Sequence, residues 1–414
     1  MTDPFPTEPP AAPVRRALPF SPRRLDRRAV SIVRTLQEAG HEAYLVGGCV
    51  RDLLLGERPK DWDVATSARP RQVARLFRRS RVLGRRFRLV HVYRGREIFE
   101  VATFRRTPPG VEEAASAEEV EVVREDNAFG TAREDAWRRD FTVNALFLDP
   151  VAGEILDWTG GLADLDARRL RTVGDADFRF REDPVRILRL IKFMRRLDLD
   201  PGPEEVAAAT RHARELAGSA PPRVAEELFR LMRTGQSEGV LDDLLGLGVL
   251  DLVLPELEPW YRAAPERLDL LRSRLAALDD VVAEGVAPDY ALSLAVLFGP
   301  RVEEELDPER RTLPVRELPQ VPATLLRDLQ GRARLPRASI QRAIGILLVQ
   351  LRMDPPPWFR ARRGRRRDPL RIVGLAGLPE ALDYLRIRLQ SEGRDLALYD
   401  EWHEWGLSQG MERR

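Results

Sequence analysis

The sequence predicts an α+β protein, with a mixed β-sheet flanked by helices in its N-terminal part and helices alone in its C-terminal part. Short apolar runs with the two-residue alternation of strands recur up to residue 157, whereas beyond Asp200 the apolar residues repeat with helical period. A chain of 414 residues with 43% hydrophobic content can bury the cores of two or three domains. We expect four regions: a disordered basic tail over 1–28, a mixed head over 29–157, a helical neck over 158–257 and a helical region over 258–414.

The basic side chains are almost all arginine, although the net charge is only +2. Lys60 and Lys192 are the only lysines, and Cys49 is the only cysteine, which excludes an intrachain disulfide. Arginine binds phosphates and stacks on bases, so this usage suits an RNA partner, but a GC-rich genome would produce the same bias. No run of about eighteen apolar residues and no apolar leader segment occurs, so we expect a cytoplasmic protein with no membrane partner.

The first 28 residues are rich in proline and arginine and show no sustained periodicity, which is typical of a disordered segment. Its arginines could contact RNA or be merely solvated. An amphipathic helix follows, with apolar residues from Val30 to Leu36, and ends at Gly40.

The stretch from Tyr44 to Thr66, YLVGGCVRDLLLGERPKDWDVAT, carries the first candidate site. A strand-like run breaks at Gly47-Gly48, where the backbone can approach a phosphate closely and a following helix start offers N–H groups to an anion. Arg51, one turn into that helix, can add contacts to phosphate oxygens.

A second strand-like run carries Asp61 and Asp63, whose side chains would project from one face while Trp62 points the other way. Carboxylates are the hard oxygen ligands that Mg²⁺ prefers when it also holds substrate phosphates. Together with the two glycines, they indicate a metal-dependent nucleotide site.

The next segments predict a hairpin. The run from Val82 to Val92 alternates as a strand, a turn lies at 94–96, and Glu97 to Arg105 returns as a second strand. Glu100 stands among apolar residues of that strand, so it needs a cation, either an arginine or a metal ion. We interpret His91 as a packing or hydrogen-bonding residue.

Residues 107–133 are acidic and contain Pro108-Pro109-Gly110, which predicts a flexible loop, and long loops are often functional lids. The segment EDAWRRDFTVN follows over 134–144, and two further strands are expected at 145–148 and 154–157.

The segment REDPVRILRLIKFMRRL, residues 181–197, predicts a helix with Pro184 in its first turn. Asp183, Arg186 and Arg189 would then share one face, and all three are candidate nucleotide-binding residues. An Asp–Arg pair can accept from an exocyclic amino group and donate to the adjacent ring nitrogen, a pattern that adenine and cytosine present and that guanine and uracil do not. A plain salt bridge within the helix is the alternative.

These motifs in this order resemble the nucleotidyltransferase superfamily, in the branch that holds bacterial poly(A) polymerases and CCA-adding enzymes. The resemblance covers residues 29 to 257 and implies a catalytic head in which Asp61, Asp63 and Glu100 form a metal-binding triad for two Mg²⁺ ions, with ATP as substrate. RRD-x-x-x-N implies ribose and triphosphate contacts from Arg138, Arg139, Asp140 and Asn144. E-D-x-x-R implies that Asp183 and Arg186 select the incoming base.

Two features favour poly(A) polymerase over CCA-adding enzyme, which stays the alternative. The segment VLGRRFRLVHV is similar to one typical of bacterial poly(A) polymerases, and the resemblance extends through LPEALDYLRIRLQSEGRDLALYDEWHEW near the C-terminus. This member of the family would polyadenylate the 3′ ends of single-stranded RNA, as in mRNA processing and turnover.

The C-terminal half is expected to guide that RNA. Residues 354–369, DPPPWFRARRGRRRDP, combine arginines with Trp358 and Phe359 and could contact a single strand, or form a solvated linker. The sequence identifies no protein partner.

Overall fold

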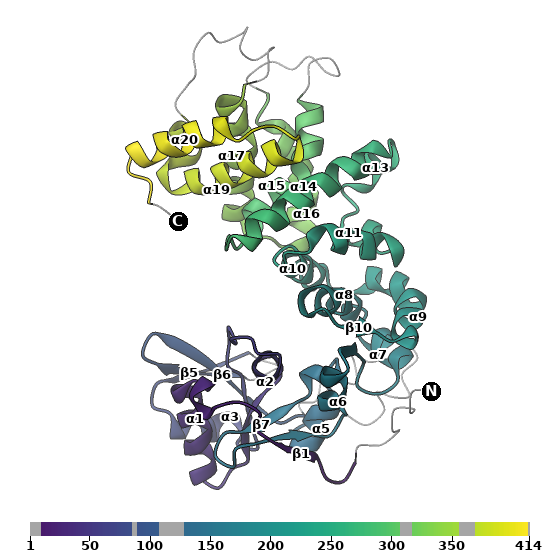
Figure 1. Ribbon diagram of the computed structural model, residues 1–414, viewed down its shortest axis with the longest axis vertical. Helices are drawn as coiled ribbons and strands as arrows, with labels where there is room; N and C mark the ends of the chain where they lie inside the picture. The colour runs from purple at the N-terminus through teal and green to yellow at the C-terminus, as the bar shows by residue number, and fades with distance from the viewer. Residues whose placement is uncertain (1–9, 85–88, 107–127, 307–316, 356–368, 413–414) are drawn as a thin grey trace. The chain divides into compact units, whose positions relative to one another are not determined.

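The computed structural model describes residues 10–84, 89–106, 128–306, 317–355 and 369–412, and these form two compact units (Figure 1). Unit 1 comprises Met1–Arg186 and Asp198–His212, and unit 2 comprises Ile187–Leu197 and Ala213–Arg414. The chain therefore passes between the units near residues 186–213, and the finer boundaries expected at 157 and 257 stay predictions. Among the described residues, no helix has both the length and the apolar character needed to cross a bilayer.

Unit 1 is built on one mixed sheet of eight strands, which confirms the predicted α+β class. In spatial order the strands are β1 (Val14–Ala17), β8 (Glu154–Asp157), β7 (Phe147–Asp149), β2 (Ala43–Val46), β3 (Val64–Thr66), β6 (Glu97–Thr103), β5 (Leu89–Arg94) and β4 (Ser80–Leu83). All neighbours are antiparallel except β3 and β6, which run parallel.

Unit 1 also contains helices and a small second sheet. They are η1 (Pro22–Arg24), α1 (Arg27–Glu38), α2 (Gly48–Leu54), α3 (Pro70–Leu76), α5 (Ala132–Trp137), η2 (Thr142–Asn144), α6 (Gly161–Asp166), α7 (Ala176–Glu182) and α9 (Pro203–His212), with β9 (Arg169–Leu170) parallel to β10 (Asp200–Pro201). Helices α1 and α3 contact each other. Helix α1 also contacts β2 and β3, and helix α3 contacts β4, β5 and β6.

The N-terminal segment differs from its prediction. Residues 14–17 form β1, which pairs antiparallel with β8 and is joined to it by an ion pair between Arg15 and Glu154. Arg16 adds a pair with Asp166 at 2.6 Å. The expected disordered tail is therefore wrong for the second half of 1–28, because a strand that pairs with a segment about 140 residues away leaves no local periodicity to detect. Residues 1–9 lie outside the described residues.

The predicted hairpin is also built differently. What was read as one strand over 82–92 is two antiparallel strands, since Ser80 pairs with Val92 and Leu83 with Leu89. Strand β5 then pairs with β6 as expected, with His91 opposite Glu100. Residues 85–88 of this segment and 107–127 of the predicted loop lie outside the described residues.

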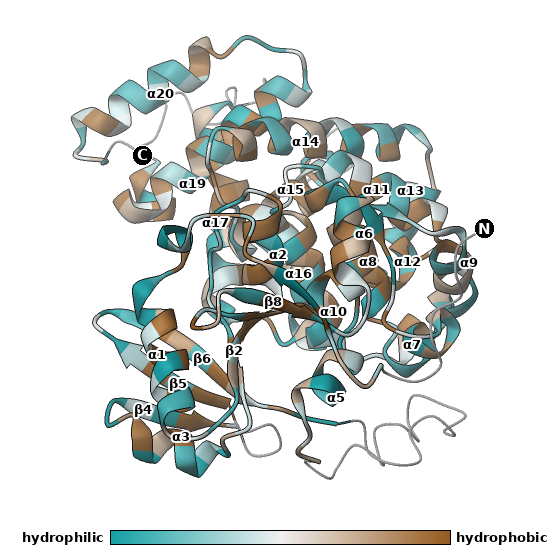
Figure 2. Ribbon diagram, turned by 60° about the horizontal axis from the view of Figure 1, so that its bottom comes forward, coloured by the Kyte–Doolittle hydropathy of each residue, from teal (hydrophilic) through white to brown (hydrophobic). Residues whose placement is uncertain are grey.

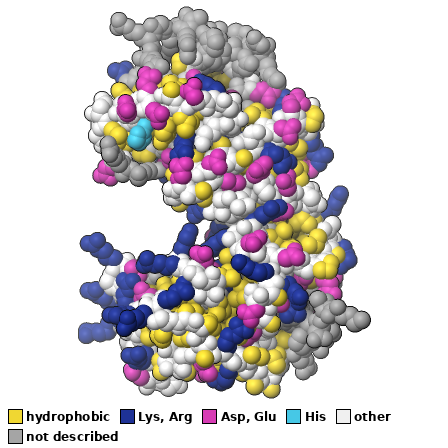
Figure 3. Space-filling view, viewed as in Figure 1, with side chains coloured by type: hydrophobic (Ala, Val, Ile, Leu, Met, Phe, Trp, Pro, Cys, Tyr) yellow, Lys and Arg dark blue, Asp and Glu magenta, His cyan; other side chains and the backbone are white. Residues whose placement is uncertain are grey.

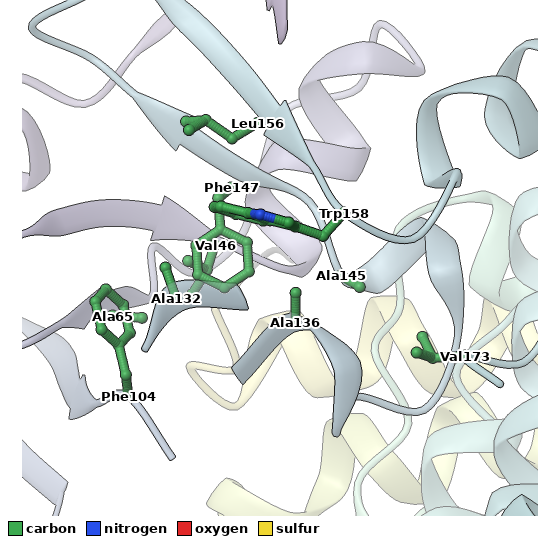
Figure 4. Close-up of a cluster of buried hydrophobic side chains, with 10 residues drawn as sticks. All are labelled: Val46, Ala65, Phe104, Ala132, Ala136, Ala145, Phe147, Leu156, Trp158 and Val173. Atoms are coloured by element: carbon green, nitrogen blue, oxygen red, sulfur yellow. The ribbon is translucent and has the colours of Figure 1, made fainter. Parts of the chain in front are cut away.

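An aromatic core fixes the centre of the sheet. Phe147 on β7 lies edge-on to Trp158 with ring centroids 5.5 Å apart (Figure 4). The ring centroids of Tyr44 and Phe104 lie 5.9 and 6.3 Å from that of Phe147. Such pairs contribute about 0.5–1.5 kcal/mol each beyond the area they bury. Val46, the last residue of β2, belongs to the same core. The core therefore fixes the position of Gly47, which follows directly in the chain.

Unit 2 is helical in all its described parts. Its helices are α8 (Arg186–Leu197), η3 (Ala213–Gly218), α10 (Pro221–Leu231), α11 (Ser237–Gly246), α12 (Leu250–Val253), α13 (Glu258–Arg262), α14 (Glu266–Ala283), α15 (Tyr290–Glu305), α16 (Gln320–Ala333), α17 (Arg337–Met353), α19 (Leu370–Ser391) and α20 (Ala397–Ser408). Helix α15 is buried along nearly its whole first three turns, and Figure 2 shows its hydrophobic residues in brown beside those of α17.

One buried charge cluster ties three of these helices together. Arg274 on α14 is 1% exposed and pairs with Glu303 on α15 at 2.9 Å, and Tyr384 on α19 donates to the same carboxylate at 2.8 Å. The arginine-rich segment expected to contact RNA, 354–369, lies almost entirely outside the described residues.

Candidate active site

Gly47 forms the turn between β2 and α2, and no other residue fits there. Its φ of 73° and ψ of −127° are unfavourable for any residue with a Cβ. A Cβ at this position would lie 3.0 Å from Nη1 of Arg139 and 3.6 Å from the carbonyl oxygen of Asn144. Gly48 differs, since a Cβ there would meet only Nη2 of Arg51, at an ordinary 3.6 Å. The turn thus places the two predicted nucleotide motifs against each other.

Arg51 connects the same two motifs from inside the protein. Its side chain is buried, its Nε and Nη2 donate to Asp52 at 2.9 and 2.6 Å, and its Nη1 donates to Oδ1 of Asn144 at 2.5 Å. The amide of Asn144 in turn donates to Asp140 at 3.1 Å. A triphosphate contact from Arg51 stays a prediction, and the contacts seen give it a positioning role.

Asp61 and Asp63 precede β3 instead of lying within it, because the strand begins at Val64. The parallel register of Val64 with Val101 brings Asp63 beside Glu100 on the neighbouring strand. Glu100 does not stand in an apolar environment as expected. Its side chain is 53% exposed, and its partner is His91, with Nε2 3.4 Å from Oε1, instead of an arginine. The alternation of β6 explains this, since Phe99 and Val101 take the buried face.

The electrostatics of these carboxylates favour a cation. Although Asp63 is exposed as a residue, burial of its carboxyl group raises its pKa to about 6, the charges of Glu100 and Asp61 raise it further, and Arg139 opposes them. A divalent ion would remove this repulsion, and carboxylates are its preferred ligands. Within the described residues, however, no three Asp, Glu, His or Cys side chains already stand as a closed ligand set. The triad is therefore a proposal whose side chains would have to converge on the ion.

Arg138 and Arg139 follow α5, which is closed at its start by a reciprocal pair of hydrogen bonds between Thr131 and Glu134. Arg139 donates to Asp135 at 3.0 Å and to the backbone oxygen of Asn144 at 3.3 Å, and it lies over the ring of Phe147. Arg138 lies 3.6 Å from the same Asp135.

Asp135 is a site residue that the sequence reasoning missed. It is buried, contacts both arginines and accepts a hydrogen bond from the backbone N–H of Arg105 at 3.1 Å. A carboxylate three and four residues before the two arginines was a signal that could have identified it.

The expected shared helix face of Asp183 and Arg186 is wrong. Helix α7 ends at Glu182, Asp183 has φ −150° and ψ 88°, and α8 begins at Arg186. Proline disfavours helical geometry in the residue before it, so Pro184 breaks the helix where it was expected to start one. The two residues still meet, because the N–H of Arg186 donates to the carbonyl of Asp183 at 2.9 Å.

Arg186 is held by a buried cluster that was not predicted. Its guanidinium donates to Glu182 and, at 3.0 Å, to the carbonyl of Arg179. Arg179 donates to the same Glu182 at 3.2 Å and reaches the carbonyls of Val173 and Trp137. The segment that carries Asp183 and Arg186 is thereby connected to the segment that carries Arg138.

Arg189 lies in unit 2 and faces Glu227, with 3.4 Å between Nη1 and Oε1. Lys192 and Arg230 contact the same carboxylate, both at 2.7 Å. Burial, assisted by the charge of Arg189, lowers the pKa of Lys192 to about 8. A nucleotide contact from Arg189 stays a prediction.

The similarity of the chain to known proteins extends over almost its whole length. It is 35% identical over 405 residues to poly(A) polymerase I of Haemophilus influenzae, a match that covers 95% of this chain and 87% of that protein. The chain belongs to the poly(A) polymerase family. The family model described as "Poly A polymerase head domain" matches residues 43–171, and "Probable RNA and SrmB- binding site of polymerase A" matches 198–261.

Two further relatives of this poly(A) polymerase family member match over shorter spans, and a solved structure matches most of the chain. Poly(A) polymerase I of Salmonella typhimurium is 40% identical over 245 residues, about half of either chain. The CCA-adding enzyme of Levilactobacillus brevis is 38% identical over 219 residues, again about half. A solved Bacillus stearothermophilus CCA-adding enzyme in complex with CTP superimposes with a TM-score of 0.62 at 26% identity, covering 92% of this chain and 81% of that one.

Proposed function

We propose that this protein adds AMP from ATP to the 3′ ends of RNA without a template and releases pyrophosphate. The observation that carries the proposal is the similarity to a poly(A) polymerase over 95% of the chain. In the cell the reaction would serve polyadenylation in mRNA processing and turnover. The RNA 3′-oxygen forms a bond to the α-phosphorus of ATP. The bond between that phosphorus and the oxygen that bridges it to the β-phosphorus breaks, and the hydroxyl proton is lost to solvent.

Asp61, Asp63 and Glu100 are assigned as ligands of two Mg²⁺ ions. The raised pKa of Asp63, which comes from burial and from the charges of Glu100 and Asp61, supports this assignment. Bound Mg²⁺ would lower the pKa of the attacking hydroxyl and stabilise the leaving pyrophosphate. Asp63 directly precedes β3 and Glu100 lies on the adjacent strand β6, so the register of the sheet brings the two residues together.

Gly47, Gly48 and Arg139 are assigned to the triphosphate. The absence of a side chain at Gly47 is what allows Arg139 to lie against the turn, so one phosphate group can meet both backbone and guanidinium. Arg138 lies one residue away and adds a second cation. Asp140 and Asn144 are assigned to the ribose, with Arg51 fixing the orientation of the Asn144 amide.

Asp183 and Arg186 are assigned to the base. A carboxylate acceptor beside a guanidinium donor matches adenine and cytosine and mismatches guanine and uracil. Glu182 and Arg179 hold the guanidinium of Arg186, which reduces the entropy lost when a base binds.

CCA addition is the second candidate, favoured by the 38% identity to a CCA-adding enzyme over 219 residues. Primer extension with Mg²⁺ separates the two, using a generic single-stranded RNA and a tRNA that ends before CCA, each with ATP, CTP or both. Long A-tails on the generic RNA with ATP alone support polyadenylation. Addition that requires CTP, stops within three nucleotides and occurs only on tRNA supports CCA addition.

Two variants on the same strand, β6, provide a matched control for this assay. Glu100→Gln removes a proposed ligand, whereas Glu97→Gln removes an exposed carboxylate three residues earlier on β6, which pairs with Arg28. Extension should be lost in the first variant and kept in the second. Equal extension by both would contradict the ligand assignment.

A further inference from the structure

A cavity of about 700 Å³ lies in unit 1 outside the residues assigned above. Its walls are η1, the first turn of α1, Leu53 of α2 and the segment 57–62. Five arginines and one tryptophan dominate the lining: Arg23, Arg24, Arg27, Arg28, Arg58 and Trp62. Sites for nucleotide-sized ligands fall in a range of roughly 300–1,000 Å³, so the cavity has room for one nucleotide.

The cavity is strongly positive. Its five arginines face only two lining carboxylates, Asp26 and Glu57, which leaves a formal charge of 5 − 2 = +3. Figure 3 shows Lys and Arg side chains projecting from the side of unit 1 that holds α1, β5 and β6. An anionic ligand is therefore the matching occupant.

Two of these arginines are held by contacts within the protein, and the other three can bind a ligand. Arg24 is fixed by two hydrogen bonds of 2.9 Å to the carbonyls of Gly56 and Glu57, and Arg28 pairs with Asp26 at 2.8 Å and with Glu97 at 2.6 Å. These two arginines shape the wall. The side chains of Arg23, Arg27 and Arg58 are exposed and make no hydrogen bond or ion pair within the part of the chain that the structure describes.

Trp62 adds an aromatic wall close to the proposed metal ligands. It is half-buried and stands between Asp61 and Asp63 in the chain. The backbone that carries Trp62 therefore also carries two proposed metal ligands, although neither of them lines the cavity. Arginines that follow a phosphate backbone, combined with an aromatic ring on which a base can stack, are the elements of single-strand recognition.

We propose that this cavity binds one nucleotide of the RNA strand upstream of its 3′ end, with the base of that nucleotide against Trp62. Arg23, Arg27 and Arg58 would contact the phosphates of this nucleotide and of its neighbours in the strand. The proposal rests on the proposed function for the identity of the strand. RNA is favoured over free ATP because the triphosphate has its own cations at Arg138 and Arg139, and because three separate arginines suit successive phosphates of a chain.

The test is fluorescence anisotropy of a 5′-labelled oligo(A), about twelve nucleotides long, with the full chain at several salt concentrations and without Mg²⁺. The triple variant Arg23→Ala, Arg27→Ala, Arg58→Ala should weaken binding at least tenfold near 0.1 M salt. Its log Kd should also depend less steeply on log salt, by about 2, as expected for three lost contacts to a single strand.

The control is a second triple variant, Arg34→Ala, Arg71→Ala, Arg75→Ala. It removes the same charge from exposed arginines of α1 and α3 that do not line the cavity. The proposal expects RNA binding by this variant to stay close to that of the unmodified chain. Equal weakening by both triple variants, or an unchanged salt dependence in the first, would overturn the proposal.

Trp62 is tested by the pair Trp62→Phe and Trp62→Ala, again by binding without metal. Phenylalanine should keep most of the affinity, whereas alanine should lose about fivefold or more. Equal affinity of both variants and the unmodified chain removes the stacking role and overturns that part of the proposal.

Binding of a fluorescent ATP analogue to the same variants separates the two sources of a nucleotide. Loss of ATP binding with intact RNA binding would show that the cavity holds free nucleotide and overturn the proposal. Circular dichroism of each variant establishes that it is folded. Because anisotropy needs no turnover, a chain that binds RNA here but fails to extend it contradicts the proposed function and leaves the cavity assignment standing.

Discussion

Two charge clusters of this protein, the carboxylates around Asp63 and the Arg274 cluster of unit 2, are organised in opposite ways. Arg274 is buried and neutralised by Glu303 and Glu392, and the hydroxyl of Tyr384 completes the set. The pKa of Asp63 is raised by burial and by the like charges of Glu100 and Asp61, and the charge of Arg139 opposes this rise. Balanced charge indicates a role in stability, and unbalanced charge at an accessible surface indicates a role in binding.

The largest expected effect is loss of catalysis at the unbalanced cluster. Asp63→Asn should reduce nucleotide incorporation by more than about 100-fold, since even groups that only support metal ligands can cost that much. In the absence of metal, the same variant should be at least as stable as the unmodified chain, because it removes the repulsion between Asp63 and its neighbouring carboxylates. Primer extension and thermal unfolding in EDTA measure the two effects, and incorporation that persists in the variant would remove the metal role of Asp63.

The balanced cluster should respond in the reverse manner. Arg274→Met leaves Glu303 and Tyr384 without their buried cation and should lower the free energy of unfolding by about 3–5 kcal/mol. Arg272→Met, on the same helix, breaks only a surface pair with Asp242 and should cost about 0–1 kcal/mol. Chemical denaturation of both variants provides the comparison, and similar losses would show that burial of the charge is not what matters.

A smaller effect is expected at Gly47 and Gly48, the two glycines at the turn between β2 and α2, which should differ in their response to substitution. Gly47→Ala should lower stability by about 1–2 kcal/mol and raise the KM for ATP, because of its positive φ and the 3.0 Å contact with Arg139. Gly48→Ala should leave stability unchanged, so any rise in its KM reports close approach of a phosphate. Thermal unfolding and steady-state kinetics distinguish them, and a stable Gly47→Ala variant would contradict the geometry.

The smallest effect concerns pH. The folded-state pKa of Asp63, about 6, lies above the ordinary value of 3.8, so the folded protein binds this proton more tightly than the unfolded chain does. The stability that this bound proton contributes is fully present below about pH 4 and is lost as the pH rises through about 6. Without metal, the melting temperature of Asp63→Asn should therefore exceed that of the unmodified chain at pH 7 and equal it near pH 4. Added Mg²⁺ should narrow the gap at pH 7, and a gap that does not depend on pH would point to another cause.

The sequence predicted features that depend on local pattern. Alternation and turn residues located β2 and the β5–β6 hairpin, and glycine at residue 47 marked a turn that only glycine can adopt. Asp61 and Asp63 became candidate metal ligands through their residue type and spacing, whereas Glu100 joined them through the family resemblance, and all three assignments stay predictions.

Features that depend on distant contacts could not be predicted in the same way. The strand Val14–Ala17 exists only through its pairing with β8, and the burial of Arg51 follows from its contact with Asn144, 93 residues later. Pro184 was a local signal that was read in the wrong sense, since it ends α7 before α8 begins. Glu182 and Asp135 were passed over because acidic residues near helix ends are common.

The first strand has a practical consequence for the sheet. β1 is only four residues long and carries Arg15 and Arg16, whereas its neighbour β8 holds the buried residues Ile155 and Leu156. Short, charged outer strands resist addition of a further strand, while an uncovered apolar one invites it. A chain shortened to begin near residue 20 would keep every assigned catalytic group, yet it should self-associate through β8 and precipitate during purification.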